Sequence, residues 1–239
     1  MRVRTNELTN VTFAVACVII TAAGVLQLWE WAERRWRQTD SPLATSISAV
    51  ERVQDVVIDT QHGTVRLCGA PQVALVEFSD FQCPFCGQYA RETYPQIIRD
   101  FVETGVAAYA FFNFPLERIH PLARAAGESA ECAGRQNKFW EMHDILFASP
   151  SAVTRKELLD HALRLGIGLD AFRECLDGGA PTRVRQQIEI AHVSGVKSTP
   201  TFFIGRLDAT QRLWAEYRVL GAQPYSVIAR ALKNALAAK

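Results

Sequence analysis

The sequence lacks most of the features that mark nucleotide-binding, nucleic-acid-binding and metal-binding proteins. Its 26 basic and 25 acidic residues leave a formal net charge of +1, so the charge balance indicates neither a nucleic acid nor a strongly acidic partner. No glycine-rich phosphate-binding loop occurs in it. Internal repeats and low-complexity tracts are also absent. A length of 239 residues then favours one globular core with an insertion.

Serine and histidine offer no catalytic constellation either. Ser79 and Ser198 have no partners in the sequence that would complete a triad. The histidines show no metal-ligand spacing, and we expect each to be a surface or capping residue. They are His62, His120, His143, His161 and His192.

Cysteine is sparse, but one pair stands where it can react. Cys83 and Cys86 are separated by two residues, close enough for a disulfide across one helical turn. Residues 73–78 before them are apolar and rich in β-branched types, which predicts a buried strand, and residues 87–102 predict a helix. Pro84 would take the first helical position, where its missing N–H is not needed. The CxxC is therefore predicted at the start of a helix.

A thiol at a helix start is unusually acidic. The first backbone N–H groups of a helix have no internal partner, and with the helix dipole they favour negative charge. They lower the pKa of a thiol there, and the thiolate is the form that attacks disulfides or binds metals. We predict that Cys83 is the exposed nucleophile and Cys86 the shielded resolving thiol, joined by a labile disulfide.

Half of a zinc site is the other interpretation of a CxxC. Structural zinc needs four ligands, usually from two such pairs. Neither a second CxxC nor an HxxxH pair is present. We therefore favour a redox pair, and we expect no metal ion and no cofactor beyond the redox-active disulfide itself.

A second segment supports the redox interpretation. Thr199-Pro200 stands in a loop directly before the apolar residues 201–204, where a cis peptide bond is expected. With this segment, the sequence resembles the thioredoxin superfamily, and within it the DsbA-like branch of BdbD-type thiol-disulfide oxidoreductases. The resemblance rests on residues 76–86 (VEFSDFQCPFC), 138–144 (KFWEMHD) and 198–204 (STPTFFI), and it runs from about residue 56 to the C-terminus.

The resemblance implies an α/β, thioredoxin-like fold, in which helices flank a central mixed sheet. It also implies an inserted all-helical domain at about residues 121–194. In such proteins the proline at the position of Pro200 is cis and packs against the disulfide, and the residue at the position of Thr199 offers its backbone to the substrate. The implied activity is disulfide exchange with cysteine-containing proteins.

Other residues near the CxxC are further site candidates. Glu77 interrupts an apolar strand, so its carboxyl is expected to be buried, with a raised pKa, and to move the proton of Cys86. A solvated strand acid is the alternative, but the resemblance places an acid here and favours the functional role. Phe85 is expected to be exposed and, with Pro84 and Thr199, to contact substrate. Strong oxidants of the family carry histidine at the position of Phe85, so phenylalanine argues against a very strong oxidising potential.

The remaining cysteines are isolated in the sequence. Cys132 and Cys175 fall in two predicted helices, and a structural disulfide between them would stabilise the protein by about 4 kcal/mol in the chain-entropy model. Two separate buried thiols are the alternative. Cys68 is expected to be buried or to pair with another molecule, and Cys17 to serve as a small apolar residue.

Residues 11–28 differ in kind from the rest of the chain. They carry no charge and are mostly apolar, and at about 1.5 Å per residue they would reach about 27 Å, close to a bilayer core. Tryptophans at 29, 31 and 36 follow, as an interfacial belt would. We predict an uncleaved signal anchor; a cleaved signal peptide, with small residues at 21–23, and a buried core helix are the alternatives.

The anchor divides the chain into predicted regions. Residues 1–10 are placed in the cytoplasm, residues 29–55 form a juxtamembrane helix and linker, and residues 56–239 form the thioredoxin-like domain. Arginines stand on both sides of the span, so the positive-inside rule does not orient it. The chemistry does, because a disulfide-handling domain is most useful outside the reducing cytosol. We therefore expect a single-pass protein of the cytoplasmic or inner membrane with its domain on the extracytoplasmic, periplasmic side.

Local patterns predict the elements of the domain. Residues 56–58 and 64–67 suggest a small hairpin, the helix after the CxxC should kink at Pro95 and end at Gly105, and residues 107–114 should form a strand. Five helices are expected between residues 121 and 194, the fourth capped by Asp170. Strands at 201–204 and 216–220 and a helix at 225–236 complete the chain. Phe78 and Phe202 are expected in the core.

The principal hypothesis is an enzyme, a membrane-anchored protein thiol-disulfide oxidoreductase that introduces disulfides into exported proteins. Such an oxidant needs a membrane redox partner, DsbB- or VKOR-like, to reoxidise it. A disulfide reductase or isomerase of the same fold is the alternative within the class. A non-catalytic, chaperone-like module that binds client chains is the alternative from another class. No nucleic acid is expected as a partner.

Overall fold

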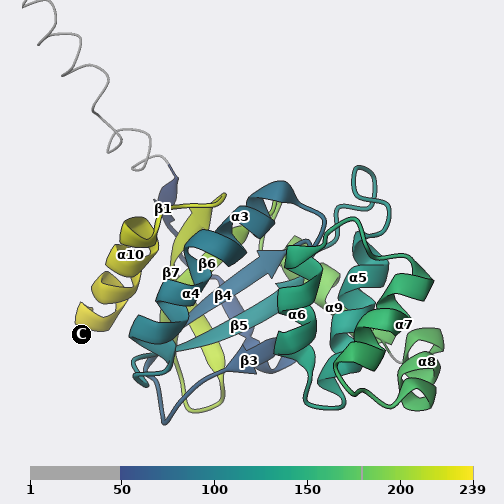
Figure 1. Cartoon of the computed structure of the whole chain (residues 1–239). Coiled ribbons are helices and arrows are strands. Elements are labelled where there is room, and N and C mark those ends of the chain that lie inside the picture. Colours follow the sequence, from purple (N-terminus) through teal and green to yellow (C-terminus); the bar gives the residue numbers. More distant parts are fainter. Residues whose placement is uncertain (1–48, 179, 239) are drawn as a thin grey trace, which may run out of the picture. The chain divides into compact units, whose positions relative to one another are not determined.

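A seven-stranded mixed sheet organises the residues that a computed structural model describes, 49–178 and 180–238 (Figure 1). The strand order is β1-β7-β6-β4-β5-β3, and β2 also pairs with β7. Strands β4 and β5 are parallel, and every other pair is antiparallel. The strands are β1 (Val50–Arg52), β2 (Val57–Asp59), β3 (Thr64–Arg66), β4 (Val73–Ser79), β5 (Ala107–Asn113), β6 (Thr201–Leu207) and β7 (Arg212–Leu220).

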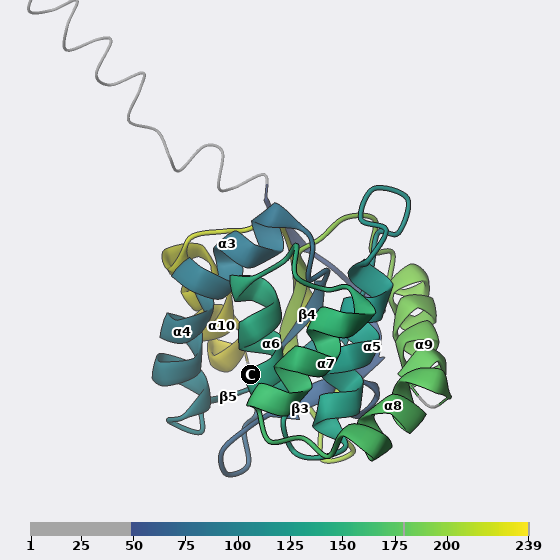
Figure 2. The same cartoon turned by 45° about the vertical axis from the view of Figure 1, so that its right-hand side comes forward.

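Helices cover both faces of this sheet. They are α3 (Pro84–Glu92), α4 (Tyr94–Ile97), α5 (Ala123–Gly134), α6 (Phe139–Ala148), α7 (Arg155–Arg164), α8 (Leu169–Asp177), α9 (Ala180–Val193) and α10 (Tyr225–Ala237), with a 3-10 turn η1 (Thr60–His62) and a π-helical turn η2 (Ile98–Val102). Figure 2 shows α3, α4 and α10 on one side of the domain and α5, α7, α8 and α9 gathered on the other.

The central strand β4 is buried on both faces, as its apolar sequence predicts. Successive side chains of a strand point to opposite faces. Val73 and Leu75 accordingly join the large core under α3, α4, α6 and α10. Val76 and Phe78 join a smaller core on the opposite face, to which α9 contributes. Glu77 has the parity of Leu75, so its carboxyl enters the large core.

The helical insertion lies between β5 and β6, as predicted, and comprises α5 to α9. Helix α7 begins at a capping box, in which the Thr154 hydroxyl and the Glu157 carboxylate satisfy each other's backbone N–H groups. The prediction that Asp170 caps the fourth helix was wrong. Gly168 is the N-cap of α8, and Asp170 lies in its first turn, where its charge still favours the helix dipole.

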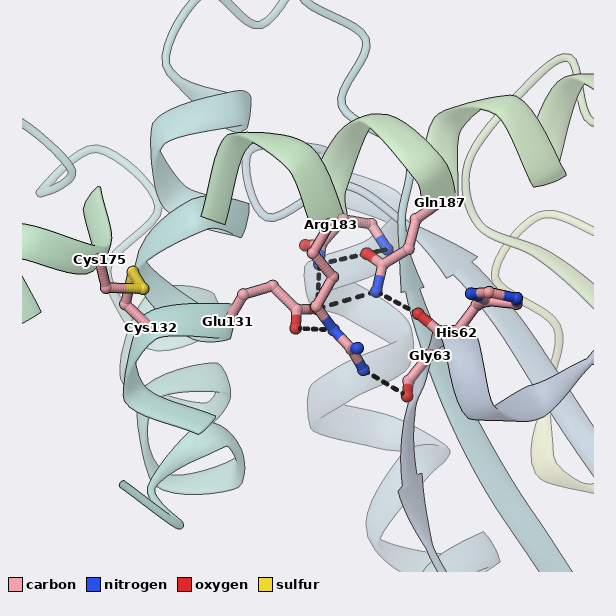
Figure 3. A network of polar contacts seen from close by, with 8 residues as sticks. His62, Gly63, Glu131, Cys132, Cys175, Arg183 and Gln187 are labelled. Carbon is pink, nitrogen blue, oxygen red and sulfur yellow. Dashed lines mark hydrogen bonds and ion pairs between the residues drawn. A yellow bond between two sulfur atoms is a disulfide. The ribbon is translucent and has the colours of Figure 1, made fainter. Parts of the chain in front are cut away.

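A buried polar cluster attaches this insertion to the sheet (Figure 3). We call Asn113, Glu131, Arg183 and Gln187 the anchoring network. Glu131 on α5 accepts hydrogen bonds from Asn113 on β5 and from Gln187 on α9, at 3.0 and 2.9 Å, and forms an ion pair with Arg183. Arg183 and Gln187 also donate to the backbone carbonyls of residues 63 and 62, respectively. The network therefore fixes two helices to one end of the β3–β5 edge of the sheet, where residues 62 and 63 lie beside the end of β5.

The predicted hairpin at residues 56–67 does not form. β2 pairs with β7, whereas β3 pairs with β5 at the other edge of the sheet. The turn η1 between them is capped by Asp59, which makes the chain cross over instead of folding back. Gly63 permits this path, because a Cβ there would lie 2.4 Å from the Phe112 ring. The local alternation was read correctly as strand, but its partners lie elsewhere in the sequence.

Three other boundaries can be compared with the predictions. β1 at Val50–Arg52 pairs with β7, so the predicted linker at 29–55 includes a strand of the sheet. The helix after the CxxC is interrupted at Thr93, two residues before Pro95, and Gly105 follows its end with a left-handed φ of 76°. In the part of the chain that the structure describes, no helix is long and apolar enough to cross a membrane. The predicted anchor at residues 11–28, with Cys17, lies outside the described residues.

Candidate active site

The CxxC lies where the end of β4 meets α3, and Asp80 shapes the loop between them. The Asp80 side chain is buried, and its Oδ1 accepts the N–H of Gln82 at 2.7 Å. Its Oδ2 accepts the N–H of Leu116 and contacts Nδ1 of His120, both at 2.8 Å. The Asp80 carbonyl also accepts the N–H of Cys83. Asp80 thus fixes the first cysteine through its carbonyl and the loop that follows β5 through its carboxylate.

Cys83 and Cys86 are free thiols in positions of unequal access. Cys83 is the N-cap of α3 with Pro84 at the first helical position, as predicted. Cys83 is 5% exposed and Cys86 is 0% exposed. The prediction of an exposed Cys83 therefore holds only relative to Cys86, because the loop before β6 packs over the first sulfur. Cys83 Sγ lies 3.5 Å from the carbonyl oxygen of Thr199.

The two thiols are driven to opposite protonation states. Hydrogen bonds from the Cys86 thiol and, among others, from the N–H groups of Cys86 and Phe85 lower the pKa of Cys83 to about 5, against the effect of burial. Burial and the adjacent Cys83 raise the pKa of Cys86 well above its ordinary value. At neutral pH the pair can therefore hold a thiolate at Cys83 and a proton at Cys86.

The loop that faces Cys83 has the predicted geometry. Thr199-Pro200 is a cis peptide bond, and Thr199 is buried. β6 begins directly after it and pairs with β4, which brings this loop beside the end of the strand that leads to the CxxC. The Thr199 carbonyl is the atom that approaches the sulfur, so Thr199 presents backbone at the thiol.

Glu77 is buried in the core on the side of Cys86. It is 1% exposed, and Tyr109 on β5 donates a hydrogen bond to its Oε2. Burial raises the pKa of Glu77 to about 7, while the hydrogen bond from Tyr109 lowers it and the charge of Cys83 raises it. In turn, the charge of Glu77 contributes to the raised pKa of Cys86. A carboxyl poised near neutrality beside a leaving thiolate is suited to proton transfer.

Apolar side chains surround the entrance to the thiols. Phe85 is 60% exposed, and Pro84 is also exposed. Ile119 and Leu122 are exposed on the loop after β5. That loop is held beside the CxxC because Gln82 accepts the N–H of Leu122 at 2.9 Å. The sequence analysis predicted the first two of these residues and missed the loop.

An aromatic cluster packs in the core beside the residues that precede the CxxC. Phe81 packs against Phe111 and Phe147, with ring centroids 5.2 and 4.7 Å apart. His143 on α6 is buried among these rings, and burial lowers its pKa. The prediction of a surface or capping role was wrong for His143 and for His161, which is also buried. Trp140 and Tyr94 extend the cluster toward α4.

The other cysteines serve different ends. Cys132 on α5 and Cys175 on α8 form the disulfide predicted from the sequence, so the alternative of two separate thiols is wrong (Figure 3). Cys68 is a free, exposed thiol, so burial was wrong, while pairing with another molecule stays a prediction. Among residues 49–178 and 180–238, no cluster of three or more histidine, cysteine or acidic side chains could hold a metal ion.

Residues that influence the thiols from other parts of the sequence were not predicted. Tyr109 reaches Glu77 because β4 and β5 pair in parallel with Leu75 opposite Tyr109. No local pattern announces that register. Asp80 could have been found from the sequence, because an aspartate directly after a predicted strand can accept the backbone N–H two residues later in an Asx turn.

Comparison with known proteins agrees with this geometry. The thioredoxin family model matches residues 63–217. BdbD from Bacillus subtilis superposes with a TM-score of 0.64 at 22% identity and covers 79% of this chain and 100% of its own. The Wolbachia pipientis protein α-DsbA1 gives a TM-score of 0.64 at 18% identity, with 75% and 96% coverage.

Curated relatives match the domain as a minor part of longer proteins. The Na(+)/H(+) antiporter NhaA 1 of Salinispora arenicola is 39% identical over 150 residues, which are 62% of this chain and 22% of the relative. NhaA 3 of Salinispora tropica is 37% identical over 161 residues, which are 66% of this chain and 24% of the relative. Their named transport activity belongs to the whole proteins and is not carried over.

A thioredoxin-like sheet that presents two thiols at a helix start defines a protein of the thiol-disulfide exchange class. The chain belongs to the thioredoxin family. It shares its fold with BdbD and α-DsbA1.

Proposed function

We propose that the chain oxidises exported proteins by passing them the disulfide between Cys83 and Cys86, from a domain anchored on the extracytoplasmic side of a membrane. The observation that carries the direction is the opposite environment of the two sulfurs. Cys83 has a pKa of about 5 and Cys86 a raised one. A thiolate stabilised at Cys83 favours the reduced form, and a couple whose reduced form is stabilised is oxidising.

The reaction follows from the access of the sulfurs. A substrate thiolate attacks Cys83 Sγ, the Cys83–Cys86 bond breaks, and Cys86 leaves as a thiolate that takes a proton from the Glu77 carboxyl. A second substrate thiolate then attacks the substrate sulfur of the mixed disulfide and releases Cys83 as a thiolate. The substrate loses two electrons and gains a disulfide, and the enzyme becomes a dithiol. Reoxidation needs a partner, for which we propose a DsbB- or VKOR-like membrane protein.

Phe85 moderates the expected strength of this oxidant. It stands between the cysteines and is exposed, but it supplies no hydrogen bond or positive charge to the Cys83 thiolate. The Cys86 thiol remains the largest stabilising donor. We therefore expect a reduction potential between that of thioredoxin, about −270 mV, and that of DsbA, about −120 mV.

The apolar surface around the thiols supports contact with unfolded client chains. Phe85, Ile119 and Leu122 present exposed apolar area beside Cys83, and Thr199 presents a backbone carbonyl. The same surface would serve a client-binding module without catalysis. The placement of the domain outside the cytosol rests on the apolar residues 11–28 and on the usefulness of disulfide transfer there.

Equilibration with glutathione tests the direction. Purified protein is incubated in a series of reduced-to-oxidised glutathione ratios, and the Cys83–Cys86 dithiol is quantified by alkylation and mass spectrometry. The Cys132→Ser/Cys175→Ser variant, analysed in parallel, separates the two cysteine pairs. A potential nearer that of DsbA supports the oxidant, and one at or below that of thioredoxin assigns the protein to the reductases.

Substitution of the cysteines separates the enzyme from the client-binding module. Cys83→Ser should abolish oxidation of a reduced test protein, whereas Cys86→Ser should trap mixed disulfides with it. Retention of the full cellular phenotype by Cys83→Ser would favour the non-catalytic alternative.

A further inference from the structure

The two oxygens of Glu77 have different surroundings. Oε2 accepts the hydrogen bond of Tyr109, whereas Oε1 is buried and has no hydrogen-bond partner among the described residues. The carboxyl thus has one oxygen without a partner and one bonded to a phenol, and its charge acts on the Cys86 thiol. Because it is 1% exposed, a proton that leaves it for Cys86 cannot be replaced by direct contact with solvent.

Phenols surround this carboxyl. Several titratable groups lie on the elements packed against Glu77. Cys83 is the N-cap of α3, and Cys86 and Tyr89 lie on that helix. The others are Tyr94 on α4, Tyr109 on β5 and His143 on α6. β6 and α10 present apolar side chains to the same core, among them Phe202 and Ile228. The charge of Glu77 raises the pKa of all three tyrosines, after the larger effect of burial, which places them within its electrostatic reach.

Tyr94 lies between the buried phenols and a surface pocket. Its ring lies 5.1 Å from that of Tyr109, centroid to centroid. Its hydroxyl is buried and has no hydrogen-bond partner within residues 49–178 and 180–238. Tyr94 also lines a pocket of about 420 Å³, which we call the Arg66 pocket, together with Arg66, Arg91, Glu103 and Asp144. The charged groups of that pocket can exchange protons with solvent.

We propose that Tyr109 and Tyr94 form the route by which Glu77 recovers its proton, with Tyr109 as the partner that positions the carboxylate and Tyr94 as the link to the Arg66 pocket. The inference rests on the proposed function, because it concerns the proton that Cys86 takes when its disulfide opens. The protonated Glu77 gives its proton to the Cys86 thiolate and becomes a carboxylate. The Tyr109 hydroxyl donates a hydrogen bond to that carboxylate until a proton arrives from the pocket side. No electron moves in this step, and the thiols that face substrate are left undisturbed.

Titration of the carboxyl tests the part played by Tyr109. The ¹³C signal of the Glu77 carboxyl, assigned with Glu77→Gln in glutamate-labelled oxidised protein, is followed against pH in the parent and in Tyr109→Phe. Loss of a hydrogen bond to the charged form should raise the midpoint by about 1 to 2 pH units. The control is Tyr217→Phe. Tyr217 lies on β7, two strands from β4, and its hydroxyl bonds to Arg52, so the substitution should leave the midpoint unchanged.

Kinetics test the part played by Tyr94. Reduction of the disulfide by dithiothreitol is followed by acid quench and thiol labelling from about pH 5 to 9, a range that spans the midpoint of Glu77. Tyr94→Phe should keep the midpoint of the carboxyl titration. At pH values above that midpoint, its disulfide should be reduced severalfold more slowly than that of the parent, with a larger solvent deuterium isotope effect. Tyr217→Phe should behave as the parent does.

The outcomes separate this inference from the proposed function. An unmoved midpoint in Tyr109→Phe overturns the positioning role, and a Tyr94→Phe variant as fast as the parent at every pH overturns the route. A parent that exchanges no disulfide with any thiol overturns the proposed function. The carboxyl titration still reports on Tyr109 in that case, because it requires no turnover.

Discussion

Two buried glutamates, each beside a cysteine pair, have opposite surroundings in this domain. Glu131 is 5% exposed, and both of its oxygens are satisfied, by Asn113 and Gln187 at one and by Arg183 at the other. Glu77 is 1% exposed, and within the described residues it has a phenol as partner but no lysine or arginine. The cysteines adjoining Glu131 are joined as a disulfide, whereas those near Glu77 are free thiols.

The difference shows that burial alone does not decide what a carboxyl does. Burial raises the pKa of both groups. At Glu131 the arginine and the amides offset that effect and turn the carboxylate into a fixed anchor. At Glu77 the unpartnered oxygen leaves the proton exchangeable near neutral pH. A buried carboxylate whose oxygens all have partners, such as Glu131, is structural, whereas one with an unpartnered oxygen, such as Glu77, can exchange its proton.

The largest expected change comes from the disulfide beside the anchoring network. Cys132→Ser/Cys175→Ser should lower the free energy of unfolding by about 4 kcal/mol in the chain-entropy model, because the closed loop spans 43 residues of sequence separation. Disulfide exchange at Cys83 should persist in the folded variant. Urea denaturation measures the loss, and Cys68→Ser, at an exposed free thiol, is the matched control. Unchanged stability would show that this disulfide does not constrain the unfolded chain.

Glu77→Gln should stabilise the protein, and increasingly so as the pH rises. The unfolded carboxyl ionises near its ordinary pKa of 4.5 and the folded one at about 7. Between these values folding takes up a proton, so the stability of the parent falls as the pH rises through this window. The variant lacks that loss and should gain about 3 kcal/mol above pH 7.

This gain is measured on the oxidised proteins, in which neither thiol of the CxxC titrates. Denaturant midpoints of the parent and Glu77→Gln are compared at steps from about pH 4.5 to 8, on either side of the expected window. Parallel curves for the two proteins would contradict the raised pKa of Glu77.

Glu131→Gln should have the opposite sign and a smaller size. It leaves Arg183 without its ion pair and disturbs the amides, which should cost about 1 to 3 kcal/mol of stability. The cost stays below that of a fully buried pair because the Arg183 side chain is 41% exposed. The reduction potential of Cys83–Cys86 should not change.

Glu128→Gln is the control for this substitution, because it lies on the same helix outside the anchoring network. Thermal denaturation of the three proteins at neutral pH gives the comparison. A Glu131→Gln variant more stable than the parent would mean that desolvation of the carboxylate outweighs its contacts.

The sequence predicted the reactive centre better than the anchoring one, for a physical reason. The CxxC, Glu77 and Thr199-Pro200 lie at the ends or on the faces of apolar strands, and such signals are local. The helical insertion was also predicted, because its helices carry local caps and apolar faces. Tyr109 could not be assigned to Glu77, because their contact depends on the register of two strands about thirty residues apart, as loop and helix packing set it.

Long-range pairing also explains the two clearest failures. The segments of the expected hairpin were read as strands, yet their partners, β7 and β5, could not be chosen from local alternation. Arg183 and Gln187 were not singled out from the sequence, because nothing local distinguishes them from the other polar residues of α9. They became members of the anchoring network only because α9 docks beside the turn η1, which offers its carbonyls.

The position of Trp140 makes it a built-in optical reporter on the buried carboxyl. Its ring lies 5.9 Å from that of Tyr109 and 6.3 Å from that of Tyr94, and the Arg66 guanidinium lies 4.6 Å from its centroid. Indole emission responds to nearby charge, so a change in the ionisation of Glu77 alters the field at this ring. Subtraction of the Trp140→Phe spectrum from that of the parent isolates this signal from the other tryptophans. Tryptophan fluorescence can thereby follow the opening of the disulfide, alongside labelling of the thiols.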